Sequence, residues 1–450
     1  MNFDNLFAII AYPVEKGINE RVTISTRCEI RATDSKTGDY ILTTLPNVEA
    51  DSTRIMNRDQ KRVVMLLWCT YACLYLGRLN LSPALPALAS ALEVSRAEVG
   101  VLGTVFFWMY AAGQFLNGQA GNHVSPRRMV AIGFGIVALV NLLFAMQASL
   151  AVMSILWAVC GFGHSMVWGP MLRILADRLD DGQRKRISTL FPMSYQLGGA
   201  ATWAVAGLLV AWGSWQTAFW VPGIVLLGVL TIWWRAGVDV QPAAVSGGFD
   251  WKEMLQEIQS LAPMLLAAAF AGFINVGGFI WLPTYVADTD LFPTALTVAV
   301  AAVLPLLGMA GMFLSGRLLH RLQRVLVTNV IVLLAALFCL ALSASLTLPA
   351  QVIWVALTMM AMGGVSALAL SSLPMVLSRR ARTSSAAGLF TAVYNVGGGL
   401  AGFLIGAIVE RWDWAHVFLV WAGCALVAAA LLWSARGREI NRKGEALEHG

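Results

Sequence analysis

The sequence predicts an all-α membrane protein with twelve transmembrane helices in two pseudo-symmetric six-helix bundles. Three observations predict it: an apolar composition, twelve apolar runs long enough to cross a membrane, and an internal repeat. Of the 450 residues, 58% are hydrophobic and 12% are charged, whereas about 25% of residues are charged in soluble domains. The net charge of +6 lies almost wholly in short connectors, which favours a role in membrane topology over nucleic-acid binding.

The twelve apolar runs have about the 20 residues that a helix needs to cross the hydrocarbon core. Lys and Arg gather in every second connector, as in Arg184–Arg186, while the opposite connectors hold only Arg96 and Arg411. Because basic residues stay on the cytoplasmic side, we expect both termini in the cytoplasm and the protein in the plasma (inner) membrane. The predicted spans are 63–88, 99–120, 128–147, 150–175, 187–211, 215–235, 260–286, 294–316, 325–346, 350–377, 385–409 and 414–434.

The chain also resembles itself at an offset of 197 to 199 residues. GQFLNG (113–118) matches GMFLSG (311–316), and Pro86 matches Pro283. Parallel repeats of this kind build carriers with a substrate site between the two halves. Glycine-rich stretches such as 397–406 fit either sliding helices or static close packing. The predicted parts are a disordered cytosolic extension (1–61), a six-helix bundle (62–235), a cytosolic linker (236–258), a second bundle (259–435) and a cytosolic tail (436–450).

One full positive charge, Arg78, lies inside the first span, in YLGRLNLSPALPAL (75–88). A mid-helix arginine costs about 2.5–3.5 kcal/mol on insertion scales, and no Asp or Glu lies inside any predicted span to offset it. A guanidinium matches carboxylate and phosphate geometry. We therefore expect Arg78 to bind an anionic substrate, the alternative being a structural arginine bonded to backbone carbonyls or snorkelling to the interface.

Other polar residues inside spans are candidates for the same site. His164 is the only histidine deep in a span, and its ordinary pKa of about 6.5 suits proton coupling; the alternative is a neutral histidine bonded to a neighbouring helix. Arg173 ends the fourth span as a gating or topological residue. The candidate hydrogen-bonding residues for substrate, which interhelical pairing would explain equally, are Tyr195, Gln196, Asn275 (the repeat partner of Arg78), Tyr394 and Asn395.

These motifs resemble the major facilitator superfamily over residues 60–435. YLGRLNLSPALPAL, VWGPMLRIL (167–175) and SYQLGG (194–199) are similar to helix motifs of two branches, the organophosphate:phosphate antiporters and the anion:cation symporters for sugar acids. The resemblance implies the major facilitator fold, an anion on Arg78 and a substrate contact for Gln196.

The chain departs from both branches at several positions. Asn275 stands where the antiporter branch has a second arginine, and Tyr195 where it has a histidine, which argues against a two-arginine phosphate clamp. His164 stands where the symporter branch has an acid. Asn122 and His123 replace the usual Asp and basic residue between the second and third helices, which weakens that charge latch.

The sequence thus predicts a secondary active transporter that moves a small organic anion, a sugar acid or other carboxylate, by alternating access with proton coupling. Two alternatives stay open: an anion exchanger (organophosphate or organic anion against phosphate) and a transporter-like receptor. The expected partners are the anion, the bilayer and protons, with no nucleic acid, and we expect a monomer. No phosphate-binding loop, metal-ligand cluster or nucleophile–base motif occurs, so we predict no enzyme, cofactor or metal.

Overall fold

The computed structural model describes residues 28–32, 40–44, 56–120, 124–180, 183, 187, 191–240, 251–322, 324–346, 350–373 and 383–436. In the predicted N-terminal extension it describes an antiparallel hairpin of β1 (Cys28–Ala32) and β2 (Tyr40–Thr44). This hairpin belongs to a compact unit separate from the helices, and the prediction of disorder falls mostly on residues outside the described ones.

The first span consists of three pieces: α2 (Arg58–Leu74), the short 3₁₀ helix η2 (Tyr75–Gly77) and α3 (Leu81–Leu92). Asn57 begins α2 with a capping box, in which its side chain accepts from the Gln60 backbone N–H at 2.8 Å while the Gln60 side chain accepts from the Asn57 N–H at 3.0 Å. This exchange satisfies two donors that a helix start leaves open. The break at η2 places Arg78.

The remaining helices match the predicted spans to within a few residues at most ends, except that α10 begins earlier. They are α4 (Arg96–Ala120), α5 (Pro126–Phe144), α6 (Leu150–Arg178), α8 (Met193–Trp212), α9 (Thr217–Ala236), α10 (Trp251–Asp288), α11 (Thr294–Leu322), α12 (Val325–Ser345), α13 (Ala350–Ala367), the π-helix η3 (Leu368–Ser372), α15 (Thr383–Arg411) and α16 (Trp414–Ser434).

Among the described residues, 11 helical segments are long and apolar enough to cross a membrane. Helix α8, which corresponds to the predicted span 187–211, is not one of them, although it has 20 residues. Its first turn carries Ser194, Tyr195 and Gln196, which lower its apolar character. These polar residues are buried or half-buried, so the structure hides from lipid the groups that make α8 a weak span.

Large apolar side chains point outward along the helices. Ile155, Phe338 and Ile353 are 66%, 60% and 62% exposed. In water such a surface would drive aggregation, whereas in a bilayer it faces acyl chains. The outer surface therefore fits a multi-pass membrane protein.

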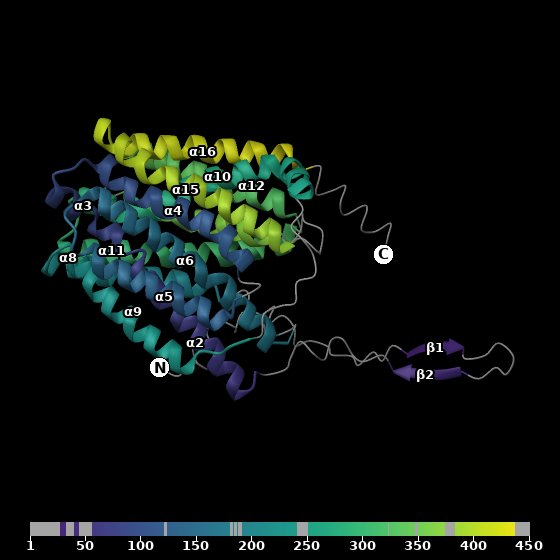
Figure 1. The fold of residues 1–450 in the computed structure, drawn as a ribbon. Coiled ribbons are helices and arrows are strands. Elements are labelled where there is room, and N and C mark those ends of the chain that lie inside the picture. Colours follow the sequence, from purple (N-terminus) through teal and green to yellow (C-terminus); the bar gives the residue numbers. More distant parts are fainter. Residues whose placement is uncertain are drawn as a thin grey trace. The chain divides into compact units, whose positions relative to one another are not determined.

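Helix packing follows the internal repeat. Helix α4 packs on α6, and its repeat partner α11 packs on α13; likewise α5 packs on α6 and α9, and α12 packs on α13 and α16. In Figure 1 the late helices α10, α15 and α16 lie side by side, while α5 and α9 lie on the opposite side of the helical unit. Equivalent sequence therefore makes equivalent contacts in each half.

Among the described residues, the most extensive contacts between earlier and later helices are those of α4 with α15, α8 with α11, and α3 with α10. The first two pairs are repeat equivalents of each other. In the third, Ser82 Oγ donates to the Phe279 carbonyl at 2.7 Å, and these residues differ by 197 positions, the offset that relates Pro86 to Pro283. The contact thus joins two repeat-equivalent residues, as expected close to a pseudo-two-fold axis.

The α4–α15 contact depends on glycine. A Cβ placed on Gly402 would lie 2.5 Å from the Gly100 carbonyl oxygen and 2.7 Å from the Thr104 backbone nitrogen, whereas a Cβ on Gly423 would meet nothing within 4 Å. Thr104 Oγ1 also donates to the Gly399 carbonyl at 2.7 Å. Helix backbones can approach this closely only where side chains are absent.

We predict that Gly402→Ala destabilises the protein by about 1–3 kcal/mol, since it overpacks a tight contact. The matched change Gly423→Ala should be neutral or stabilising, because alanine is the better helix former by about 1 kcal/mol. Thermal unfolding of both variants in detergent measures the difference. A Gly402→Ala variant that melts at or above the wild-type temperature would show that the helices separate freely.

Candidate functional site

The break in the first span positions Arg78. After η2, Arg78 adopts φ −124° and ψ −51°, which leaves the Gly77 carbonyl outside the helical ladder. Asn141 Nδ2 and Cys160 Sγ donate to this carbonyl at 3.0 and 3.5 Å. A Cβ on Gly77 would lie 2.6 Å from Val137 Cγ1, so only glycine lets the turn pack here. The local sequence thus determines the position of the Arg78 guanidinium among the helices.

The Arg78 guanidinium lies among aromatic rings. Its Cζ is 4.8–5.3 Å from the ring centres of Tyr75, Phe106, Phe107 and Tyr110. Each cation–π contact contributes about 0.5–2 kcal/mol, so together they offset a cost of the size expected for an intramembrane arginine. They accept no strong hydrogen bond, however, and Nε is buried without a hydrogen-bond partner.

No carboxylate neutralises Arg78 in the described part of the chain: the ion pairs there involve other residues. Nor do three His, Cys, Asp or Glu side chains of the described residues come together as a metal site. The site therefore combines a fixed positive charge with neutral polar groups. That combination suits an anion.

His164 on α6 lies in the same aromatic surroundings. Its side chain is 1% exposed, and its ring is 5.3, 5.9 and 5.5 Å from those of Tyr75, Phe106 and Tyr110. Neither ring nitrogen has a hydrogen-bond partner. The structure shows no hydrogen bond from His164 to a neighbouring helix: ring contacts surround His164, and its proton-coupling role stays a prediction.

Tyrosine rings connect this cluster to the later helices. The Tyr71 and Tyr75 hydroxyls are 3.5 Å apart, and the Tyr75 ring stacks on Tyr195 with centres 5.8 Å apart. The Tyr195 hydroxyl in turn donates to Met312 Sδ of α11 at 3.8 Å. Tyr195 thus lies between the Arg78 surroundings and the second half. Trp168 packs on Tyr71, with ring centres 4.8 Å apart.

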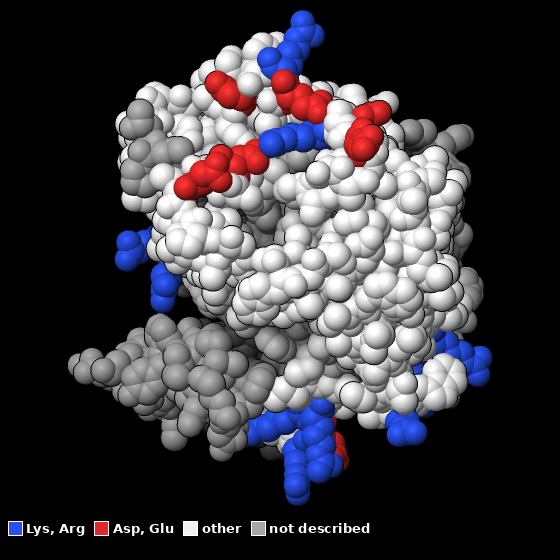
Figure 2. Space-filling model, turned by 90° about the vertical axis from the view of Figure 1, so that its left-hand side faces the viewer, with Lys and Arg blue, Asp and Glu red and all other residues white. Residues whose placement is uncertain are grey.

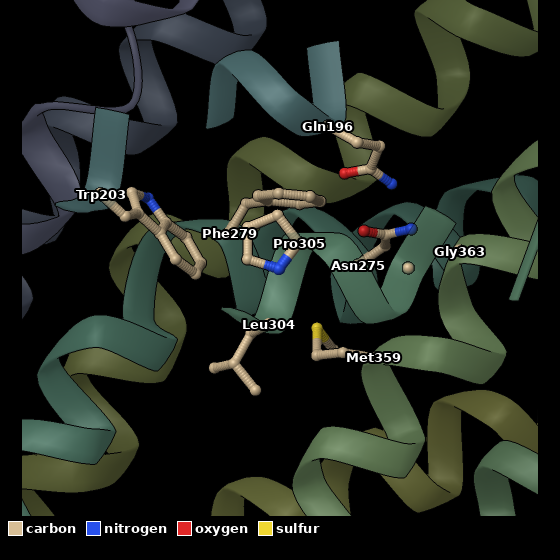
Figure 3. A pocket seen from close by; sticks show the side chains of 9 residues that line it. Gln196, Trp203, Asn275, Phe279, Leu304, Pro305, Met359 and Gly363 are labelled. Atoms are coloured by element: carbon tan, nitrogen blue, oxygen red, sulfur yellow. The ribbon is translucent and has the colours of Figure 1, made fainter. Parts of the chain in front are cut away.

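A separate small pocket lies between α8, α10, α11 and α13. In Figure 3 the amides of Gln196 and Asn275 face each other across one end of it. Gln196 Oε1 is buried without a partner, and Asn275 Nδ2 donates to the Met362 carbonyl at 3.0 Å. The other lining residues are Trp203, Phe279, Leu304, Pro305, Gly308, Met359 and Gly363.

The predicted site residues therefore form two groups. Arg78 and His164 share one set of rings, and Gln196 and Asn275 share the pocket. Tyr195 contacts the first group, and Tyr394 lies beside Asn275.

Two predicted residues join neither group. Asn395 Nδ2 donates to the Thr391 carbonyl of its own helix at 2.7 Å, which uses the amide locally. Arg173 is half-buried toward the end of α6, and its gating role stays a prediction. Asn122 and His123 lie outside the described residues.

The ring partners of Arg78 on α4 could not be recognised from the sequence. Phe106 and Tyr110 are spaced four residues apart, so they share one helix face. In the sequence alone, such a helix face cannot be distinguished from an ordinary core-packing face. Only its position against Arg78 and His164 distinguishes it.

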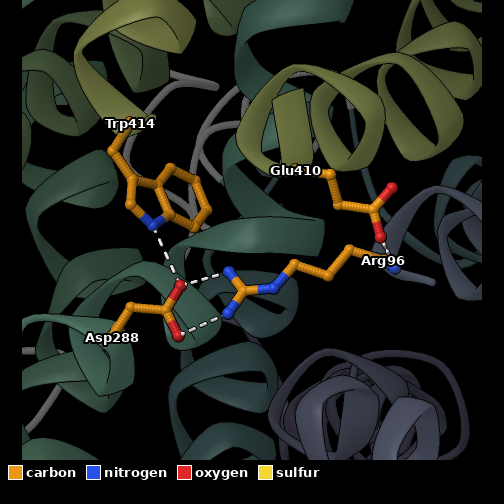
Figure 4. A network of polar contacts seen from close by, with 4 residues as sticks. All are labelled: Arg96, Asp288, Glu410 and Trp414. Carbon is orange, nitrogen blue, oxygen red and sulfur yellow. Dashed lines mark hydrogen bonds and ion pairs between the residues drawn. The ribbon is translucent and has the colours of Figure 1, made fainter. Parts of the chain in front are cut away.

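A cluster of polar contacts joins earlier and later helices at one end. The Arg96 guanidinium at the start of α4 pairs with Asp288 at the end of α10, and the Arg96 backbone N–H donates to Glu410 of α15. Trp414 Nε1 also donates to Asp288 Oδ2, at 3.0 Å. Figure 4 shows these four residues, which we name the end latch.

Acidic side chains gather on the end of the helices that Figure 2 shows, with few basic ones among them. The end latch matches that pattern, since its one arginine meets two acids. Arg96 was notable in the sequence as one of only two basic residues in the acidic connectors. Its partner Asp288 lies 192 positions away, which no local pattern reveals.

Comparisons with known proteins agree with this architecture. The Major Facilitator Superfamily profile matches residues 67–402. A "Probable hexose phosphate transport protein" of Chlamydia trachomatis is 21% identical over 422 residues, 85% of this chain and 92% of the relative. The protein of the same description from Chlamydia pneumoniae is 26% identical over 168 residues, and the chain spans only 37% of that relative's length.

Among solved structures, the nucleoside transporter NupG superposes with a TM-score of 0.67 at 15% identity, over 84% of this chain and 99% of NupG. At this identity the likeness concerns the fold. With the match over 67–402, the resemblance predicted from the helix motifs is confirmed: the chain belongs to the Major Facilitator Superfamily.

Proposed function

We propose that the protein is a secondary active transporter of a small organic anion, a sugar acid or another carboxylate, driven by protons. The observation that carries the proposal is Arg78: a cation in a ring cluster, with a buried Nε that has no protein partner and no carboxylate beside it among the described residues. A carboxylate would supply both the acceptor and the counter-charge.

The transport cycle would be alternating access between two six-helix bundles, 62–235 and 259–435. The repeat-equivalent contacts α4–α15 and α8–α11 support rocking of one bundle on the other. The end latch joins the bundles on one side, so it would hold that side closed while the opposite side admits the anion. Arg173 on α6 would act in gating at the other end of its helix.

Substrate contacts beyond Arg78 would come from Tyr195, Gln196, Asn275, Tyr394 and Asn395. The support is strongest for Gln196 and Asn275, because their amides line a pocket. They would bind hydroxyl groups of a sugar acid. Asn395 would have to release its bond to Thr391 before it could contribute.

His164 would carry the coupling proton. Its two ring nitrogens without partners near Arg78 support this role, since the described residues place no other histidine in these surroundings. We predict that His164→Gln abolishes acceleration of uptake by a pH gradient but leaves exchange of labelled for unlabelled anion intact. Proteoliposomes with and without the gradient measure this, and gradient-driven uptake by the variant would assign the proton elsewhere.

The second candidate substrate is a hexose phosphate, taken up in exchange for phosphate. It is suggested by the similar Chlamydia proteins, which are described as probable hexose phosphate transport proteins. Asn275 offers an amide where that branch has a second arginine, and a phosphate dianion next to a single cation leaves one charge unpaired. The carboxylate is therefore the better fit.

Uptake into proteoliposomes tests both candidates. Purified protein is supplied with labelled gluconate or glucose 6-phosphate, with a pH gradient or with phosphate inside. Gluconate uptake that depends on the pH gradient supports the proposal. Glucose 6-phosphate uptake that depends on internal phosphate supports the alternative.

The remaining proposals concern the membrane, the topology and the oligomeric state. Both termini would lie in the cytoplasm and the protein in the plasma (inner) membrane, as a monomer. The acidic end shown in Figure 2 would then face outward, consistent with exclusion of basic residues from that side.

A further inference from the structure

Helix α4 carries a second polar side chain on the face that contacts Arg78. Gln114 follows Phe106 and Tyr110 at the same four-residue spacing, which keeps all three on one face. Tyr110 lies beside both Gln114 and Arg78. Although it lies close to the Tyr110 hydroxyl, Gln114 Nε2 is buried without a hydrogen bond of good geometry.

Unpaired polar atoms therefore converge at Tyr110 from three helical segments. They are Arg78 Nε from the first span, Gln114 Nε2 from α4, and both ring nitrogens of His164 from α6. Buried donors without acceptors are destabilising, and native proteins keep few of them. Their grouping around a single tyrosine indicates a place built for an acceptor.

We propose that Gln114 is a substrate-binding residue, and that Arg78, Gln114, His164 and the Tyr110 hydroxyl together bind one carboxylate group of a monoanion. This rests on the proposed transport function and specifies its substrate class. A carboxylate has two oxygens with about four acceptor positions, which these donors match in number.

Charge favours the same class. Arg78 is the only permanently charged member of the set, since Gln114 and Tyr110 are neutral and His164 supplies a donor when it is neutral. While His164 is neutral, a monoanion fully balances Arg78, whereas a phosphate dianion keeps an uncompensated charge in a poorly solvated site. The rings of Phe106 and Phe107 add contact but no further charge.

Two substitutions of Gln114 test the assignment. Gln114→Met keeps the length of the side chain without its donors, and Gln114→Glu places a carboxylate beside Tyr110, which itself contacts Arg78. We expect Gln114→Met to raise the half-saturating concentration of a monocarboxylate about tenfold, and Gln114→Glu to abolish binding by occupying Arg78. Gln147→Met is the matched control, because Gln147 Nε2 already donates to the Leu143 carbonyl; it should bind as wild type.

The measurement is ligand-induced thermal stabilisation of the purified full chain. The probes are gluconate, lactate and benzoate as monocarboxylates, and glucose 6-phosphate and inorganic phosphate as the other anions. Wild-type affinity in both Gln114 variants, or a preference for glucose 6-phosphate that Arg78→Ala removes, overturns the inference but leaves anion transport standing. If Arg78→Ala changes the response to none of the probes, the proposed function itself fails.

Discussion

Arg78→Ala is expected to abolish anion uptake, by about 100-fold or more, while the protein stays folded. Truncating one partner of a buried, hydrogen-bonded charge pair costs about 2–5 kcal/mol of binding, and each 1.4 kcal/mol is a factor of about ten. Folding should not suffer equally, because the substitution also removes an intramembrane charge that costs about 2.5–3.5 kcal/mol to insert. Loss of function with unchanged or raised melting temperature is an unusual combination, and it separates a binding residue from a structural one.

Proteoliposome uptake of gluconate, normalised to reconstituted protein, measures the effect. Arg78→Lys should retain part of the activity, since it keeps the charge but loses the planar fork. Arg62→Ala is the control, because Arg62 pairs only with exposed Asp59 at 3.7 Å. Wild-type uptake by Arg78→Ala would remove Arg78 from substrate binding and, with it, the proposed function.

Asp288→Asn is expected to open the latched end of the protein. The substitution removes the charge that pairs with Arg96 but keeps an oxygen for Trp414 Nε1. Because the Arg96 and Asp288 side chains are 37% and 23% exposed, solvent weakens the pair, and we assign it about 1 kcal/mol. That value corresponds to about a fivefold shift of the population toward the state open at this end.

Spin labels placed at Glu93 and Trp412, two exposed positions on the connectors of this end, report the opening as longer distances in double electron–electron resonance. Asp290→Asn is the matched control. Asp290 has φ +49°, a conformation that asparagine also tolerates, and the described part of the chain records no ion pair for it. A double variant that exchanges the two charges, Arg96→Asp with Asp288→Arg, should partly restore the wild-type distance between the spin labels. Unchanged distances in Asp288→Asn would mean that helix packing alone, through Gly100 and Gly402, keeps this end closed.

The amino-acid sequence alone was sufficient for the helical architecture and the family. Span length, the alternation of basic connectors and the 197-residue offset are properties of the linear chain, because bilayer thickness and membrane topology act on one segment at a time. Arg78 was detectable for the same reason: a charge inside an apolar run is anomalous without knowledge of its neighbours. The fifth span was predicted at 187–211, although the polar residues at the start of α8 lower its apolar character.

Contacts between distant segments depended on the tertiary structure. The rotation and tilt of the helices against each other decide whether His164 has a partner and which face of α4 meets Arg78. They also decide that Arg96 pairs with Asp288. Such choices are made by packing over the whole unit, where many faces of similar apolarity compete. The sequence by itself therefore determined the helices, their repeat and the one buried charge, while only the tertiary structure decided which neutral side chains surround that charge and which ions join the two halves.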